Sequence, residues 1–464
     1  MTPMEPEVPG RIAGGHPIEP LETAPSEVTR RRRRVAVGVV VAVVVSVVLL
    51  ATFLRQEGVP KARTIWAEDG VVFAECALGP DPLACLSMPY AGYLHTSARL
   101  GALVAPLGDL EGLPLRLTLA AGLITAFAAA LLAIAVYDVT ASSAAGVVAG
   151  VTAGTLAGVG VALVDSAGRE VLGNLTNLHW VLLTASVVVV ICAWLGKKPG
   201  IADLVLLFVT PLSSGIAPFV LVPLSLVAVG LRTPGSRRMA LVILAASVPQ
   251  VITVATHPRW GPDQQVLPIR DVLSVGAAMV RGGWFGADRQ LENVLVVGLA
   301  VAVTLALLLR GRYLPAAAVL ALGVTGVGIF SVSAYLNGYA AVRFGLPPAA
   351  LTVAAIALGT ALLAERTSLL GERMSALAVR VSMRPGWTPM RAGTPLLVSV
   401  TALLALGFAG SFRLQTEATT GPDVVEQVGA ARDDCRAGAT TFELLTSPLD
   451  DPPSWRWTVP CARL

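Results

Sequence analysis

The stretch RRRRRVAVGVVVAVVVSVVLLATFL, residues 30–54, joins five arginines to an unbroken apolar run that begins at Val35. A helix of about twenty apolar residues is long enough to cross the hydrocarbon core of a membrane. The run is too long for the apolar region of a secretory signal peptide, and no convincing small-residue cleavage site follows it. We therefore predict a signal anchor that stays in the membrane.

Similar runs recur through the chain. Its 464 residues are 55% hydrophobic and 14% charged, and the mean hydropathy is +0.72, which is too apolar for a soluble domain. The sequence thus predicts an all-α polytopic membrane protein with about eleven transmembrane helices, one pair of them a hairpin of short segments. The expected spans are 35–54, 115–136, 142–164, 178–195, 201–213, 215–231, 239–256, 293–309, 313–333, 344–363 and 394–412.

Positive charge predicts the orientation of these spans. Basic residues concentrate in the short connections on one side, which by the positive-inside rule faces the cytoplasm. The N-terminus is then cytoplasmic and, with an odd number of spans, the C-terminus is extracytoplasmic. No basic patch is interleaved with aromatic residues, so we expect no nucleic-acid partner. The basic residues are Arg30–Arg34, Lys197, Lys198, Arg232, Arg237, Arg238, Arg310, Arg312, Arg366, Arg373, Arg380, Arg384 and Arg391.

The cysteines agree with this orientation. Four of the five fall in segments assigned to the outside, where disulfides persist, and Cys192 lies within a span. Four cysteines allow three pairings. The simplest joins Cys76 to Cys85 and Cys435 to Cys461, and we expect that one.

Three regions follow from these assignments. Residues 1–34 form a cytoplasmic tail, predicted to be disordered and basic at its end, residues 35–412 form the transmembrane domain, and residues 413–464 form a small extracytoplasmic cap. The long first outside loop contains MPYAGYLHTSARLGALVAPL, residues 88–107, whose mixed character favours an interfacial helix.

Two features within the spans have both a structural and a functional interpretation. Glycines at every fourth position, from Gly146 to Gly158, leave one helix face without side chains, which favours close helix packing over a substrate groove. The proline-rich segment 206–226 carries a polar SSG and predicts two short helices that turn near the outer surface. Such a turn either lines a cavity or is a plain hairpin.

The stretch TIWAEDGVVFAEC, residues 64–76, places Glu68 and Asp69 side by side at the start of the first outside loop. An ionisable pair at a membrane margin is a candidate functional site, and a carboxylate outside the bilayer can act as a general base on a hydroxyl. The alternative is a solvated loop or the start of a helix, where acidic residues are favoured. The residues alone do not decide between the two.

Other polar and aromatic residues fall on the same side. The histidines His95, His179 and His257 lie near span ends, where they either surround a substrate or are simply solvated; none shows metal-ligand spacing. Arg99 follows His95 by four residues, which places both on one helix face.

Arg343 stands at the mouth of the tenth span, where it either binds a phosphate or anchors to lipid headgroups. Four tryptophans near the outer interface are typical of an aromatic belt: Trp66, Trp180, Trp260 and Trp284.

Over residues 35–412 the chain resembles the GT-C superfamily of integral-membrane glycosyltransferases, of the bacterial type. The matching elements are WAEDGVVF (66–73), GYLHTSARL (92–100), NLTNLHW (174–180) and VRFGLPPAAL (342–351). Their order and common membrane side resemble the family more than any one motif does. The large soluble C-terminal domain of several members has no counterpart here, which argues against a polymeric or protein acceptor.

The resemblance implies inverting transfer of a sugar from a polyprenyl-phosphate donor to an acceptor hydroxyl on the outer face of the inner (plasma) membrane. The acceptor would be an envelope glycan or a lipid. Asp69 would be the base, with Glu68 assisting it or holding an optional divalent cation, and Arg343 would stabilise the leaving phosphate. No other cofactor is implied. The remaining pocket residues would be His95, Arg99, Asn177, His179, Trp180 and His257.

Two other classes of protein remain open. A transporter or lipid-linked-saccharide flippase places ionisable residues at mid-membrane and often has two related halves. A non-catalytic membrane subunit needs a small-residue or apolar face for its partner, and the glycine face of the third span is a candidate.

Overall fold

The computed structural model describes residues 27–141, 146–165, 170–257, 289–337, 341–380, 421–447 and 455–464, with a few single positions between them. Within these residues seven helices are long and apolar enough to cross a membrane, and three shorter apolar helices lie beside them. These elements coincide with the first ten predicted spans. The eleventh, 394–412, lies almost entirely outside the described residues. The chain is a multi-pass membrane protein whose exact span count stays a prediction.

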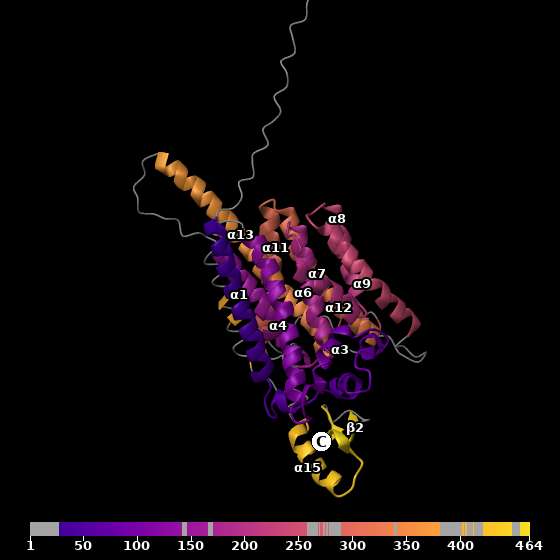
Figure 1. The fold of residues 1–464 in the computed structure, drawn as a ribbon. Coiled ribbons are helices and arrows are strands. Elements are labelled where there is room, and N and C mark those ends of the chain that lie inside the picture. Colours follow the sequence, from indigo (N-terminus) through magenta and orange to yellow (C-terminus); the bar gives the residue numbers. More distant parts are fainter. Residues whose placement is uncertain are drawn as a thin grey trace, which may run out of the picture.

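The helices form one bundle (Figure 1). α6 is buried along its whole length, and so is the apolar part of α13, so these two helices form the centre of the bundle. The remaining helices surround them and turn apolar side chains outward. In chain order the bundle contains α1 (Glu27–Leu54), α4 (Leu113–Thr140), α5 (Gly146–Leu163), α6 (Leu178–Trp194), α7 (Ile201–Val209), α8 (Ala217–Gly230), α9 (Ser236–Thr256), α11 (Gln290–Leu309), α12 (Tyr313–Asn337) and α13 (Leu346–Arg380).

Helix α1 begins earlier than predicted. It starts at Glu27, so the arginines at 30–34 belong to the helix and not to a disordered tail. Arginine is a good helix former, and an acidic residue in the first turn favours a helix start. Arg33 also forms an ion pair of 2.7 Å with Asp138 near the end of α4.

The glycine face of α5 packs against α4, as predicted. A Cβ on Gly154 would lie 2.6 Å from the carbonyl oxygen of Ala133. A Cβ on Gly158 would lie 2.8 Å from the side chain of Val44 and 2.9 Å from that of Ala133. Since real Cβ atoms do not approach so closely, only glycine permits this helix spacing. The packing interpretation is confirmed.

The two ends of the bundle differ. The start of α1 and the C-terminal end of α13 lie at one end of the bundle, and the first loop and the C-terminal cap lie at the other (Figure 1). The connection between α11 and α12 lies at the first end, since Arg310 and Arg312 donate hydrogen bonds to the Leu363 and Leu362 carbonyls of α13. Which end faces the cytoplasm stays a prediction.

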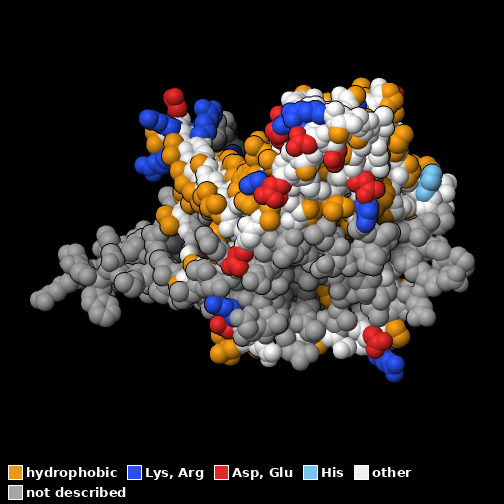
Figure 2. Space-filling view, turned by 90° about the horizontal axis from the view of Figure 1, so that it is seen from below, with side chains coloured by type: hydrophobic (Ala, Val, Ile, Leu, Met, Phe, Trp, Pro, Cys, Tyr) orange, Lys and Arg blue, Asp and Glu red, His pale blue; other side chains and the backbone are white. Residues whose placement is uncertain are grey.

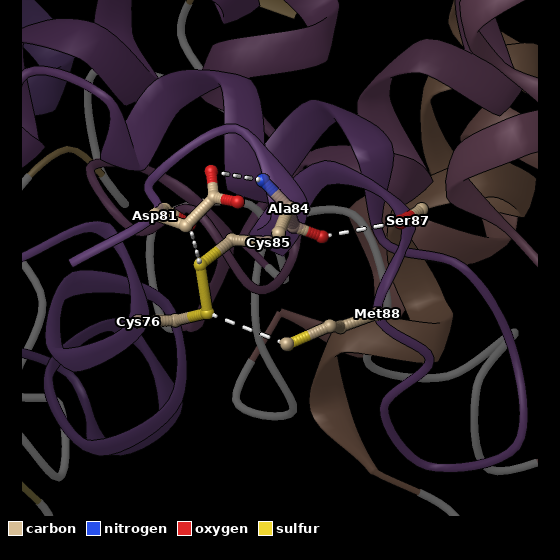
Figure 3. The surroundings of a disulfide bond; sticks show 6 residues. All are labelled: Cys76, Asp81, Ala84, Cys85, Ser87 and Met88. Atoms are coloured by element: carbon tan, nitrogen blue, oxygen red, sulfur yellow. Dashed lines mark hydrogen bonds between the residues drawn. A yellow bond between two sulfur atoms is a disulfide. The ribbon is translucent and has the colours of Figure 1, made fainter. Parts of the chain in front are cut away.

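The first loop folds into short helical turns. A π-helical turn, η2 (Asp69–Ala74), runs into α2 (Glu75–Ala77), and a seven-residue helix, α3 (Thr96–Ala102), lies where the interfacial helix was predicted. Most of α3 is buried. The predicted disulfide between Cys76 and Cys85 is present, and the Asp81 carboxylate accepts a hydrogen bond from the Ala84 N–H beside it (Figure 3).

The cap contains a helix and a two-stranded antiparallel sheet, which the all-α prediction missed. Its elements are α15 (Val424–Arg436), β1 (Thr441–Leu445) and β2 (Arg456–Pro460). Side chains alternate between buried and exposed along both strands, so each strand turns one face toward the interior, and β1 packs against α15. The predicted disulfide between Cys435 and Cys461 joins α15 to the end of β2.

Candidate active site

A cavity of about 550 Å³ lies at the cap end of the bundle. Its walls come from the first loop, the start of α6, the turn between α7 and α8, the ends of α9 and α12, the turn before α13, and the cap. Six of the predicted site residues line this one cavity: Glu68, His95, Asn177, His179, Trp180 and Arg343. Residues up to 275 positions apart in sequence (343 − 68) therefore meet here.

Three other predicted site residues do not line the cavity. Asp69 is buried behind it. The guanidinium of Arg99 lies 5.4 Å from the centre of the Phe73 ring, and burial lowers its pKa. His257 is exposed at the end of α9, where its Nδ1 lies 2.9 Å from the Thr256 hydroxyl.

The two adjacent carboxylates have different surroundings. Asp69 is 2% exposed and accepts three hydrogen bonds: one from the Leu175 N–H (2.7 Å), one from the Thr176 N–H (2.9 Å) and one from the Thr176 hydroxyl (2.6 Å). Burial raises the pKa of Asp69 to about 6, although these donors oppose the rise. Asp69 therefore ties the first loop to the turn before α6, and Glu68 faces the cavity.

Lys61 is a buried cation behind the cavity that sequence reasoning missed. Its Nζ lies 5.6 Å from the centre of the Trp66 ring. Burial lowers its pKa to about 8, and the negative charges of Asp69 and Glu170 partly oppose this change. The interior behind the cavity is thus polar and holds charges of both signs.

One wall of the cavity consists of stacked rings. The Tyr93 and His95 rings stack with their centres 4.0 Å apart, and the His95 and His179 centres are 6.0 Å apart. The His179 ring is 4.5 Å from that of Trp180. His179 Nδ1 lies 2.8 Å from the Thr176 carbonyl oxygen, so Nδ1 carries the hydrogen in the neutral ring and Nε2 is the acceptor.

The prediction of an aromatic belt is wrong for two tryptophans. Trp66 is 8% exposed and Trp180 is 5% exposed, and both line the cavity. A belt tryptophan keeps its ring at the lipid interface, whereas these two rings pack inside the protein. Trp260 and Trp284 lie outside the described residues.

Arg343 lies in the 3₁₀ turn η7 (Val342–Gly345), directly before α13. Its Nη1 is 2.8 Å from Glu170 Oε2, and its side chain is 27% exposed. The backbone carbonyl of Glu170 accepts a hydrogen bond of 2.8 Å from Asn177 Nδ2. Glu170 thus holds the guanidinium at the edge of the cavity and links it to the start of α6.

The cavity also has an apolar side. Phe219 of α8, Val254 of α9, and Val332 and Leu336 of α12 line it. Phe219 is 63% exposed, and Val332 and Leu336 are among the exposed apolar side chains of the bundle. Because these helices are predicted spans, we expect this side to face lipid.

Several lining residues were not predicted as site residues. Tyr90 and Tyr93 lie in the first-loop segment 88–107, and Ser214 lies in the SSG turn, for which a cavity was one of the two interpretations. Trp455 comes from the cap and carried no local signal. Among the described residues no group of three or more His, Cys, Asp and Glu could hold a metal ion.

Comparison with known proteins gives no family model and no curated relative that matches the chain. Among solved structures, the Archaeoglobus fulgidus oligosaccharyltransferase tethered with an acceptor peptide is 14% identical; the match covers 87% of this chain and 57% of that one, with a TM-score of 0.44. ArnT from Cupriavidus metallidurans in the apo state is 15% identical over 89% of this chain and 80% of that one, and its TM-score is also 0.44. The structure of ArnT bound to undecaprenyl phosphate gives 14% identity, coverages of 86% and 79%, and the same TM-score.

Proposed function

We propose that this protein transfers a sugar from a polyprenyl-phosphate donor to an acceptor hydroxyl at the extracytoplasmic face of the membrane. One observation carries the proposal: a single cavity holds a carboxylate, two imidazoles and a guanidinium, and its other side is lined by apolar side chains of predicted spans. A donor with a charged phosphate and a long apolar chain needs both kinds of surface.

Glu68 is the base in this proposal, in place of Asp69. It lines the cavity, whereas three donors occupy the Asp69 carboxylate. Glu68 accepts the proton of the acceptor hydroxyl as that oxygen forms a bond to the anomeric carbon. Attack from the face opposite the phosphate inverts the anomeric centre.

The bond between the anomeric carbon and the phosphate oxygen breaks in the same step, and its electron pair leaves with polyprenyl phosphate. Arg343 lies at the edge of the cavity with its positive charge already oriented by Glu170. A positive group held in place stabilises the charge that develops on the leaving phosphate. The phosphate would bind Arg343 together with Glu170 or displace Glu170 from it.

The test is release of polyprenyl phosphate from polyprenyl-phosphate sugars by purified protein in lipid. Glu68→Gln keeps the shape of the side chain and removes its basicity, so we expect a rate at least about 100-fold lower. Glu75→Gln is the matched control, because Glu75 is exposed in the same loop and does not line the cavity. It should retain the wild-type rate.

Full activity of folded Glu68→Gln would refute the assignment of the base. If wild type releases no lipid phosphate from any donor but moves a lipid-linked saccharide across vesicles, the flippase alternative replaces the transferase.

A further inference from the structure

The C-terminal cap is joined directly to the acidic stretch of the first loop. The Ser447 N–H donates to the Ile65 carbonyl (2.9 Å), and the Ala67 N–H donates to the Ser447 carbonyl (2.6 Å). Ser447 is completely buried. The backbone that carries Glu68 is therefore paired with the cap as in a short stretch of β-sheet.

Side chains support the same contact. A Cβ on Gly70 would lie 2.9 Å from the Thr446 methyl group, so the cap packs against the residue that follows the acidic pair. Arg63 forms an ion pair of 2.7 Å with Asp423 at the start of α15. Contacts with residues before and after Glu68 in the chain therefore fix the position of the cap.

The cap places Trp455 in the wall of the cavity. Trp455 is half-buried and packs against Trp66, and both side chains line the cavity beside Glu68. The Trp455 carbonyl accepts a hydrogen bond of 3.0 Å from the Thr446 N–H, which connects the tryptophan to the segment that pairs with the loop. The apolar residues on the opposite side of the cavity come from the bundle helices, so the cap forms a different wall.

The chemistry of this wall indicates what it binds. A sugar ring has an apolar face of C–H groups and a rim of hydroxyls, so it fits against aromatic rings flanked by a few polar groups. Tyr90 and Tyr93 add two hydroxyl-bearing rings to the same cavity. On the described part of the face seen in Figure 2, acidic and basic side chains are interspersed.

We propose that Trp455 and Trp66 form the acceptor subsite and that the acceptor is a carbohydrate, whose ring lies against these tryptophans with one hydroxyl directed at Glu68. This assignment rests on the proposed transfer reaction, because it supplies the hydroxyl that Glu68 deprotonates. Trp455 then determines acceptor specificity, although it lies outside the transmembrane bundle.

The experiment measures sugar binding without a donor. Wild-type protein in nanodiscs is titrated with methyl glycosides and disaccharides of glucose, galactose, mannose and arabinose, and binding is followed by saturation-transfer NMR. We expect at least one sugar to bind, with affinity at least tenfold lower in Trp455→Ala and largely retained in Trp455→Phe. Arg456→Ala is the control, because Arg456 is the neighbouring exposed residue and its ion pair is with Glu443 of the cap.

The outcomes separate this inference from the proposed function. Equal binding by wild type and Trp455→Ala, with equal thermal stability, would overturn the acceptor subsite, and so would the absence of binding by any sugar. If a sugar binds through Trp455 but wild type releases no lipid phosphate from any donor, the carbohydrate subsite stands and the transferase proposal fails.

Discussion

The hydrogen bond between Thr176 and Asp69 is the sharpest test of the role assigned to Asp69. Its donor and acceptor oxygens are 2.6 Å apart, and the Asp69 carboxylate is buried. A hydrogen bond to a charged group contributes about 1.5–3 kcal/mol to stability. Since Thr176 is half-buried and lines the cavity, we expect the lower end, about 1.5 kcal/mol.

A double-mutant cycle isolates this contribution. Asp69→Ala alone removes three hydrogen bonds but also removes a carboxylate whose ionisation burial disfavours, so its net effect combines opposing energies. Thr176→Val removes only the hydroxyl. It should cost about 1.5 kcal/mol in wild type and almost nothing in Asp69→Ala, where the carboxylate is gone.

The free energy of unfolding is measured by SDS titration in mixed micelles, with circular dichroism as the readout. Equal losses from Thr176→Val in the two backgrounds would show that the hydroxyl and the carboxylate are not coupled. The structural role of Asp69 would then be refuted, and Asp69 would again be a candidate base.

Three further predictions test the fold. Gly154→Ala should lower stability by about 1–3 kcal/mol because its methyl group meets the Ala133 carbonyl, whereas Gly38→Ala, which meets nothing within 4 Å, should not; equal unfolding midpoints would contradict this. Cys435→Ser should destabilise the cap by about 2–4 kcal/mol, seen as faster proteolysis of the cap with an unchanged bundle, and an unchanged cleavage rate would count against it. The folded pKa of Asp69 is raised to about 6, so the stability contributed by its protonated form is full below pH 4 and is lost as the pH rises through 6. The free energy of unfolding should fall by about 3 kcal/mol over this range. Asp69→Asn should lack this part of the pH dependence of the unfolding midpoint, and identical pH profiles for the two proteins would contradict the raised pKa.

The sequence was sufficient for features that depend on local composition. Inside a bilayer a backbone must satisfy its hydrogen bonds within a helix, so the length of an apolar run predicts a span without reference to neighbours. The glycine repeat of α5 predicts close packing because its spacing alone places the glycines on one helix face. The start of α1 was misplaced because arginines suit a helix as well as a tail.

The division of roles within the acidic pair was beyond the sequence. Glu68 and Asp69 are adjacent, so their side chains leave the backbone in different directions, and the packing of the chain decides which one is buried. The turn before α6 supplies donors to Asp69 from residues 106 and 107 positions away. The motif placed both carboxylates in the right loop but did not distinguish them.

The cap is a second case in which the sequence predicted the segment but not its contacts. Its disulfide and its place outside the bundle followed from the cysteines and the spans, because both depend on which side of the membrane a segment occupies. That Trp455 enters the cavity depends on the pairing of Ser447 with the stretch around Trp66, a contact across 381 positions (447 − 66). The sequence thus predicted the ten apolar helices of the described residues and the simplest of the three disulfide pairings, since length, hydropathy and compartment are local properties. Only the tertiary structure decided which side chains line the cavity, because that depends on contacts between segments far apart in the chain.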